Sequence, residues 1–196
     1  MAPVIVLTTD TTHHRYFLNR LRGEGLPIGP VIFETTSVKP PFPTGPLYES
    51  EEERFERARW PELLTLEGFD IHRVDNFNQA ESLTILDGLA PGFGLVFGAR
   101  RLRPAVLERF PDGLVNVHRG VAQDYRGLDS ELWSIYHGDW NGIGVTLHLT
   151  DAELDAGPIV AQERLTLVRG MKTHQLRAFT TEIAARLMAD VVRSQV

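Results

Sequence analysis

Hydrophobic residues along this chain fall into short runs that alternate with longer amphipathic stretches. Runs rich in β-branched residues predict strands, and they lie near residues 3–8, 28–33, 71–74, 94–98, 114–118, 143–149 and 158–165. Stretches with apolar positions at helical spacing predict helices, and they lie near residues 16–21, 50–60, 79–86, 130–137 and 173–192, with a further helix opening at Pro104. Strand–helix alternation through residue 140 predicts an α/β fold with an open, mainly parallel twisted sheet and helices on both faces.

The length predicts one core. A chain of 196 residues and 22.0 kDa buries roughly 70% of its surface on folding, so residues 1–196 are predicted to form a single domain. A proline-rich loop or insertion at about 36–50 and a helix at about 173–193 stand apart from the alternation. The apolar stripe of that helix, from Leu176 to Val191, is predicted to pack on its own sheet. A homodimer contact built from this helix and the loop is the alternative.

Charge and composition exclude several classes of protein. The net charge is −6, from 20 basic and 26 acidic residues, whereas proteins that coat nucleic acids carry a basic surplus, so no nucleic-acid partner is expected. The apolar runs are too short to cross a bilayer and the N-terminus has no leader pattern. We therefore expect no membrane partner and a cytoplasmic location. With no cysteine, disulfides, thiolate nucleophiles and Cys-ligated zinc are excluded.

The turn after the first strand holds two adjacent histidines, His13 and His14. Neighbouring positions on a helix point about 100° apart, and no His-Glu-x-x-His spacing occurs, so no metal site is predicted. The pair is interpreted as polar capping plus a surface histidine. The same turn lacks the glycines of a phosphate-cradling or dinucleotide-binding loop, which disfavours nucleotide motors and dehydrogenases.

Asn116 and His118 form the sharper signal. In a strand, positions i and i+2 face the same side, so an amide N–H and a ring N–H can reach one point and hold a developing oxyanion. Asp155 supplies a carboxylate that would favour a protonated histidine and assist proton removal from an amine. Taken singly, all three are equally explained as polar strand-end and turn residues, and spacing alone does not bring them together.

Four segments taken together resemble the folate-dependent formyltransferase family: Leu114–His118, Tyr125–Gly127, Gly144–His148 and Leu154–Pro158. The resemblance covers residues 92–165 well and implies the Rossmann-like formyltransferase fold. It places the family's catalytic residues on Asn116, His118 and Asp155, and it implies 10-formyltetrahydrofolate as the formyl donor, with no metal. The residues implied to hold that co-substrate are Phe97, Ala99, Arg100, Arg101, Leu102, His148, Thr150 and Asp151.

The chain departs from the family where the acceptor amine would bind. The segment after His118 is Arg119-Gly-Val-Ala-Gln123 in place of a Ser-Leu-Leu-Pro-type loop, which makes Arg119 and Gln123 candidate acceptor contacts. Further candidates follow the first strand: Asp10, Thr11, His13 and Arg15. Aromatic residues that are candidates for stacking on a base are Tyr16, Tyr48 and Trp60.

The resemblance implies formyl transfer to the primary amine of a small acceptor. The first turn lacks the Gly/Ser-rich phosphate loop of the purine-pathway enzyme, and we expect no room for the tRNA-gripping C-terminal domain or for the regulatory domain of the deformylase. A nucleotide-linked amino sugar is therefore the leading acceptor. The alternatives are a hydroxyornithine-type or glycinamide ribonucleotide acceptor, hydrolysis of 10-formyltetrahydrofolate, and folate binding without catalysis.

Overall fold

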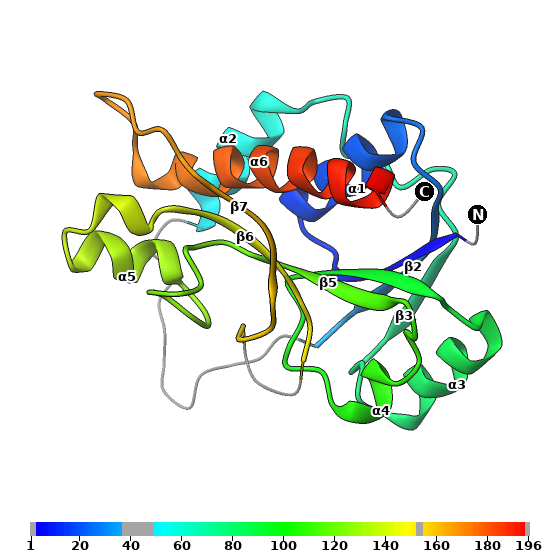
Figure 1. Ribbon diagram of the computed structural model, residues 1–196. Helices are drawn as coiled ribbons and strands as arrows, with labels where there is room; N and C mark the ends of the chain where they lie inside the picture. Colours follow the sequence, from blue (N-terminus) through cyan, green and yellow to red (C-terminus); the bar gives the residue numbers. More distant parts are fainter. Residues whose placement is uncertain (1–2, 37–48, 152–154, 195–196) are drawn as a thin grey trace.

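The computed structural model describes residues 3–36, 49–151 and 155–194. Over these residues the chain forms one seven-stranded sheet with the order β3-β2-β1-β4-β5-β6-β7 (Figure 1). The strands are β1 (Val4–Thr9), β2 (Ile28–Glu34), β3 (Ile71–Val74), β4 (Phe93–Phe97), β5 (Gly113–His118), β6 (Gly144–Leu149) and β7 (Ile159–Arg164). Each predicted strand is present, and no end is shifted by more than one residue.

The sheet is parallel from β3 to β5 and antiparallel from β5 to β7. The predicted open, mainly parallel sheet is therefore confirmed. The chain starts at β1 in the middle, builds outward through β2 and β3, and then returns to β4 on the other side of β1. Such a reversal of direction opens a crevice at the carboxyl ends of the central strands. The ends of β1, β4 and β5 thus share the edge where a ligand is expected.

Helices cover both faces of the sheet. On one face lie α1 (Thr12–Gly23), α2 (Glu49–Arg59) and the long α6 (Thr173–Ser194), and on the other lie α3 (Ala80–Leu89) and α4 (Pro104–Leu107). Helix α5 (Ser130–Tyr136) and the short 3₁₀ helix η1 (Trp140–Gly142) follow β5 and lie at one end of the sheet (Figure 1). No helix among the described residues is long and apolar enough to cross a membrane.

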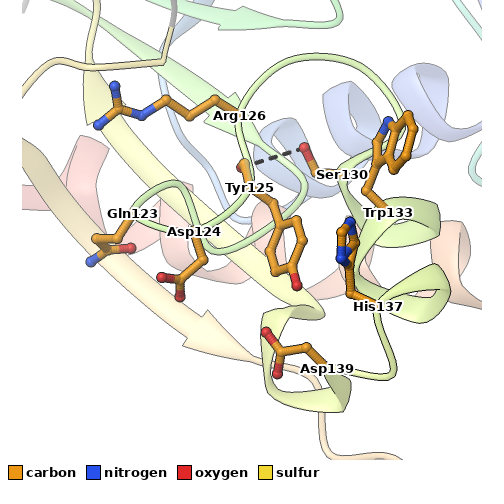
Figure 2. A pocket seen from close by; sticks show the side chains of 8 residues that line it. All are labelled: Gln123, Asp124, Tyr125, Arg126, Ser130, Trp133, His137 and Asp139. Atoms are coloured by element: carbon orange, nitrogen blue, oxygen red, sulfur yellow. Dashed lines mark hydrogen bonds between the residues drawn. The ribbon is translucent and has the colours of Figure 1, made fainter.

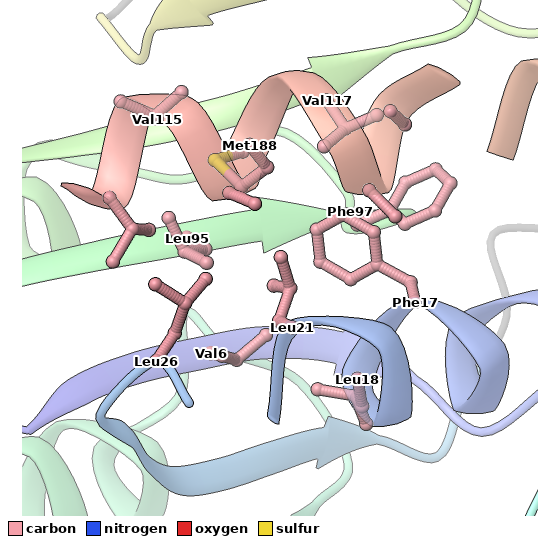
Figure 3. Close-up of a cluster of buried hydrophobic side chains, with 14 of the residues drawn as sticks. Val6, Phe17, Leu18, Leu21, Leu26, Leu95, Phe97, Val115, Val117 and Met188 are labelled. Atoms are coloured by element: carbon pink, nitrogen blue, oxygen red, sulfur yellow. The ribbon is translucent and has the colours of Figure 1, made fainter. Parts of the chain in front are cut away.

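The strand alternation builds two cores. In β1, Val4 and Val6 face the larger cluster under α1 and α6, whereas Ile5 and Leu7 face the cluster under α3 and α4. Figure 3 shows the larger cluster, in which Met188 of α6 lies over Leu95 and Val115. The prediction that the C-terminal helix packs on its own sheet is confirmed.

The structure contradicts the prediction that Tyr16 and Trp60 stack on a bound base. Tyr16 and Trp60, which were candidates for stacking on a ligand, are buried and stack on each other, with ring centroids 3.9 Å apart and planes 17° apart. They belong to the core because α1 and the end of α2 close over the sheet at this point. Tyr48 and residues 37–48 of the predicted proline-rich loop lie outside the described residues.

Candidate active site

The end of β5 brings Asn116 and His118 to the carboxyl edge of the sheet. They are two residues apart on one strand and face the same side, as predicted. Across the antiparallel β5–β6 pair, Asn116 lies directly opposite His148. Directly opposite side chains in such a pair are close neighbours. The sheet therefore assembles an amide and two imidazoles without any contribution from a loop.

Asp155 completes this group from the turn between β6 and β7. Its Oδ2 lies 3.2 Å from Nδ1 of His118, and its Oδ1 accepts a hydrogen bond of 3.2 Å from Nδ2 of Asn116. The same carboxylate accepts a bond of 2.9 Å from the Gly127 backbone N–H. The structure thus brings together the three side chains that the sequence only suggested.

The turn that carries Asp155 is tightly constrained. Asp155 has φ = +48°, a left-handed conformation that is uncommon for a residue with a side chain. Two residues on, a Cβ at Gly157 would lie 1.8 Å from the Leu149 carbonyl oxygen, so only glycine fits there. Strained backbone persists where its surroundings hold it, and it clusters at functional sites. Here the bonds to the carboxylate hold the turn against β6.

Hydrogen-bond accounting indicates how each imidazole is used. Nε2 of His118 lies 2.7 Å from the Tyr125 carbonyl oxygen, while its Nδ1 faces Asp155, so a ring with a proton on each nitrogen donates to both. Nδ1 of His148 lies 2.9 Å from the Leu149 carbonyl oxygen. Its Nε2 lies 3.0 Å from Nδ2 of Asn116 and 3.4 Å from Oδ1 of Asp155. The Asn116 amide therefore donates to Asp155, and its contact with Nε2 of His148 is a hydrogen bond only when that nitrogen carries no proton.

The electrostatics of the group centre on Asp155. Burial would raise the pKa of this carboxyl, but hydrogen bonds with His118 and His148 hold the pKa well below its usual range. Burial would likewise lower the pKa of His148, but the bond to Asp155 outweighs it and the pKa is raised. The carboxylate is thus ionised at neutral pH, and it favours the protonated form of the neighbouring imidazole.

A narrow slot opens beside this group, with about 40 Å³ of space accessible to water. Nine of the eleven residues predicted as catalytic or folate-binding line it; only His118 and Phe97 do not. The nine are Asn116, Asp155, Ala99, Arg100, Arg101, Leu102, His148, Thr150 and Asp151. The slot is also lined by Val96, which the sequence analysis did not predict. Neighbouring residues of a strand face opposite sides of the sheet, so either Val96 or Phe97 of β4 could have been expected there, and the structure selects Val96.

Phe97 itself faces the opposite side of the sheet. Its ring is buried in the larger core, in edge contact with His14 and Phe17 at 4.5 and 5.1 Å. The Arg100 guanidinium forms an ion pair of 2.6 Å with buried Glu34 at the end of β2, so it fixes the segment that follows β4. Residues 99–102, which line the slot, are thus anchored to the end of β2.

The slot is lined mainly by polar and charged residues, among them the Asp151 carboxylate; its apolar lining residues are Val96, Ala99 and Leu102. Polar groups fixed around a pocket set the orientation of a bound ligand. Among the described residues, the inaccessible Thr150 hydroxyl has no hydrogen-bond partner, and such groups normally find one. The described residues hold no cluster of three or more histidine or acidic side chains arranged for a metal ion.

The six candidate acceptor contacts are scattered. Asp10 pairs with Arg15 at 2.6 Å and with Arg73 of β3 at 3.9 Å, so these two candidates lie toward the β3 side, away from His118. Arg119 follows His118 and pairs with Glu131 at 3.4 Å. Gln123 accepts a hydrogen bond of 2.6 Å from Gln162. Of the six, Arg119 and Gln123 are therefore nearest to the group around Asp155.

The remaining two candidates are Thr11, which is exposed, and His13, which forms a buried pair with His14. His13 and His14 are 6% and 4% exposed, so the interpretation as a surface histidine was wrong. Nδ1 of His14 lies 2.7 Å from the Thr11 hydroxyl, and the two rings are 4.0 Å apart. Burial, with the positive charges of Arg119 and Arg177, lowers the pKa of His14 to about 3. Burial and the neighbouring His14 hold the pKa of His13 well below its usual value, so both rings are neutral.

A second, larger pocket of about 740 Å³ lies between the segment after β5 and helix α5. Figure 2 shows the ring of Tyr125 pointing into it, with Trp133 and His137 on the facing helix. Of the acceptor candidates, Gln123 lines it. Sequence reasoning missed this pocket, although the aromatic residues at 133, 136 and 140 in an otherwise polar stretch were an available signal.

Comparison with known proteins identifies the class. A family model described as formyl transferase matches residues 79–192, more than half of the chain. The chain is 29% identical over 126 residues to the methionyl-tRNA formyltransferase of Finegoldia magna and 34% identical over 126 residues to that of Roseiflexus sp. (strain RS-1). These matches cover 64% of this chain but only 40% and 38% of those proteins. The chain belongs to the formyl transferase family.

Solved structures agree on the fold. The glycinamide ribonucleotide transformylase 1 of Symbiobacterium toebii superimposes with a TM-score of 0.71 at 20% identity, covering 98% of this chain and 86% of that one. A sugar N-formyltransferase from Shewanella gives a TM-score of 0.65 at 12% identity, covering all of this chain and 72% of that one. The Rossmann-like formyltransferase fold expected from the resemblance is confirmed.

Proposed function

We propose that this protein is an enzyme that transfers the formyl group of 10-formyltetrahydrofolate to the primary amine of a small acceptor. The observation that carries the proposal is the convergence of Asn116, His118 and Asp155 at the end of β5, where the Asp155 carboxylate lies within hydrogen-bond distance of both other side chains. Membership of the formyl transferase family supports the reaction class. The slot beside Asn116 supports a flat co-substrate.

The arrangement suits acyl transfer through a tetrahedral intermediate. The neutral amine attacks the formyl carbon, and the Asn116 amide and the His118 ring donate hydrogen bonds to the oxyanion that forms. In the structure Nε2 of His118 donates to the Tyr125 carbonyl, and the Asn116 amide donates to Asp155 and lies 3.0 Å from Nε2 of His148. We therefore propose that the formyl oxygen replaces the Tyr125 carbonyl and one of the Asn116 partners, since catalytic hydrogen bonds often tighten only when substrate binds.

Asp155 orients the His118 ring and assists the transfer of the amine proton. Its carboxylate fixes Nδ1 of His118 and stabilises the positive charge on that ring. A water held by the same carboxylate carries the proton from the attacking amine to the departing folate nitrogen as the bond from the formyl carbon to that nitrogen breaks. The products are a formamide and tetrahydrofolate.

For the acceptor we propose a nucleotide-linked amino sugar. The net charge of −6 weighs against a tRNA acceptor, because tRNA binding draws on a basic surface. The first strand–helix turn offers no glycine-rich loop for the phosphate of glycinamide ribonucleotide. A hydroxyornithine-type amine remains the second candidate among acceptors.

Two other functions rest on the same residues. Water in place of the amine would make the protein a 10-formyltetrahydrofolate hydrolase. A protein that only binds folate would not need the convergence of Asn116, His118 and Asp155, so this convergence favours catalysis.

The test is a formyl-transfer assay with 10-formyltetrahydrofolate and a panel of amino sugar nucleotides, hydroxyornithine and glycinamide ribonucleotide. We expect turnover with an amino sugar nucleotide and formate release at least tenfold slower without an amine. Asn116→Ala removes one oxyanion donor and should lower kcat about 100- to 1,000-fold. Equal formate release with and without amine would select the hydrolase, and tight folate binding without turnover on any amine would select a binding protein.

A further inference from the structure

The surface around α5 is unusually rich in exposed aromatic residues. Trp133 is 54% exposed, Tyr136 is 80% exposed and Trp140 of η1 is 57% exposed. Large apolar side chains that gather on the surface usually mark a binding site. Here they lie beside the 740 Å³ pocket, a size typical of small-molecule sites.

The aromatic walls of this pocket are held in place. The Tyr125 ring packs on the backbone of Gly142, where an added Cβ would come within 2.5 Å of the ring. On the facing helix, Trp133 is in edge contact with Tyr136 at 5.8 Å, and the His137 ring lies 6.1 Å from that of Tyr125. Figure 2 shows Trp133 and His137 on one side of the Tyr125 ring. Fixed aromatic faces of this kind stack on flat rings at little cost in side-chain entropy.

The polar lining of the pocket includes two carboxylates, Asp124 and Asp139. Asp124 is exposed, and Asp139 lies close enough to Tyr125 that burial together with a hydrogen bond from the phenol raises the pKa of Tyr125. Gln123 adds an amide oxygen. Carboxylates bind the N–H donors of a heterocycle and repel phosphate. The pocket therefore favours a flat ring with N–H groups, while Arg126 supplies a positive charge at its border.

The same segment forms a wall of the pocket and covers the catalytic group. The Tyr125 carbonyl accepts the hydrogen bond from Nε2 of His118, and the Gly127 N–H donates to Asp155. The hydroxyl of Ser130, which lines the pocket, donates to the Gly127 carbonyl at 2.9 Å. A molecule that extends from this pocket along residues 125–127 would thus bring its far end to His118.

We propose that this pocket binds the nucleobase of the acceptor, stacked on Trp133 and Tyr125 with its N–H groups bound by Asp124 and Asp139. The proposal rests on the proposed function, and it narrows the acceptor to an amine joined to a nucleotide. The predicted stacking residues Tyr16 and Trp60 are buried in the core, so the role of stacking on the base passes to Trp133 and Tyr125, which line the pocket.

Calorimetric titration of the full chain with the five common nucleoside diphosphates tests this proposal, with ribose 5-phosphate as a probe that lacks a base. We expect at least one nucleoside diphosphate to bind and ribose 5-phosphate to give no heat of binding. Trp133→Ala should weaken the binding about tenfold or more, as loss of base stacking does. The matched control is Trp140→Ala, equally exposed but outside the lining, which should change the affinity less than twofold.

A second variant tests the polar half of the proposal. Asp124→Asn should weaken the nucleoside diphosphate about tenfold, and should have much less effect on an analogue whose base N–H is methylated. Absence of binding by every nucleoside diphosphate, or equal affinity in the Trp133 and Trp140 variants, would overturn the proposal. If the pocket proposal fails in this way but the protein transfers a formyl group to an amino sugar without a nucleotide, the proposed formyltransferase function still holds. If the protein binds a nucleotide but transfers no formyl group to any amine, the pocket proposal holds and the proposed function is wrong.

Discussion

Two pairs of buried histidines lie at the carboxyl edge of this sheet, His13 with His14 and His118 with His148, and only the second pair belongs to the proposed active site. His14 and His148 are 4% and 2% exposed, so they are equally removed from water. Yet the pKa of His14 is lowered to about 3, whereas the pKa of His148 is raised. The difference is Asp155, which the second pair shares and the first lacks. Burial alone makes a histidine inert, and a buried carboxylate beside it makes the ring available for acid–base chemistry.

The largest expected effect is a loss of kcat, and it should appear when one histidine of the second pair, but not of the first, is replaced by asparagine. His118→Asn should lower kcat for formyl transfer by at least about 100-fold, because it removes an oxyanion donor. His14→Asn should leave kcat within a few-fold and reduce the free energy of unfolding instead. Steady-state kinetics and urea unfolding on both variants make the comparison. Loss of turnover in the His14 variant, with normal turnover in the His118 variant, would reverse our assignment of the two pairs.

The neutral pair predicts a dependence of stability on pH. The folded-state pKa of His14, about 3, lies below the unfolded value of about 6.5, so the unfolded chain binds more protons between these values. Stability is therefore full above pH 6.5 and falls as the pH drops, by about 1.4 kcal/mol per pH unit for one such group. Urea midpoints from pH 7 to pH 4 should fall more steeply for the wild-type protein than for His14→Asn. Parallel curves would show that His14 is not held neutral.

For His148, which lies beside Asp155, we predict a pH dependence of stability with the opposite sign. A raised folded-state pKa means that His148 stabilises the protein below pH 6.5 and that this contribution disappears as the pH rises through the folded-state pKa. Asp155→Asn removes the partner, so the His148 ring should then titrate below pH 6.5. The measurement is an NMR titration of the ring protons in the two proteins. An unchanged His148 titration would mean that Asp155 does not set its protonation.

The smallest effect is expected at the hydroxyl that caps the neutral pair. Thr11→Val removes the contact of 2.7 Å with Nδ1 of His14 and should lower the free energy of unfolding at pH 7 by about 1 kcal/mol. Thr11→Ser keeps the hydroxyl and serves as the control. A valine variant as stable as the serine variant would show that this contact contributes nothing.

Periodicity predicted the central strands of this fold because β1, β4 and β6 are compact runs with most residues buried. It also placed Asn116 and His118 on one face of a strand. Asp155 lies 39 residues from Asn116, and the antiparallel return of β6 and the turn before β7 close that distance. Spacing in the sequence carries no information about this return, so the family resemblance was needed to connect the three residues.

Side-chain burial was the part that the sequence predicted least well. His13 and Trp60 were assigned to a ligand site, but packing of α1 and α2 on the sheet places them inside. Trp133, which is 54% exposed, was not among the predicted ligand contacts. Which face of a surface helix remains open depends on how the helices pack together, and a single amphipathic pattern does not specify that.

The most direct test of the central claim is the single-turnover rate of formyl transfer in Asp155→Asn, measured beside Asp190→Asn, an exposed carboxylate on α6. Our account predicts that the Asp155 variant binds 10-formyltetrahydrofolate but transfers the formyl group at least about 100-fold more slowly, while the Asp190 variant matches the wild-type protein. Equal rates in all three proteins would contradict it.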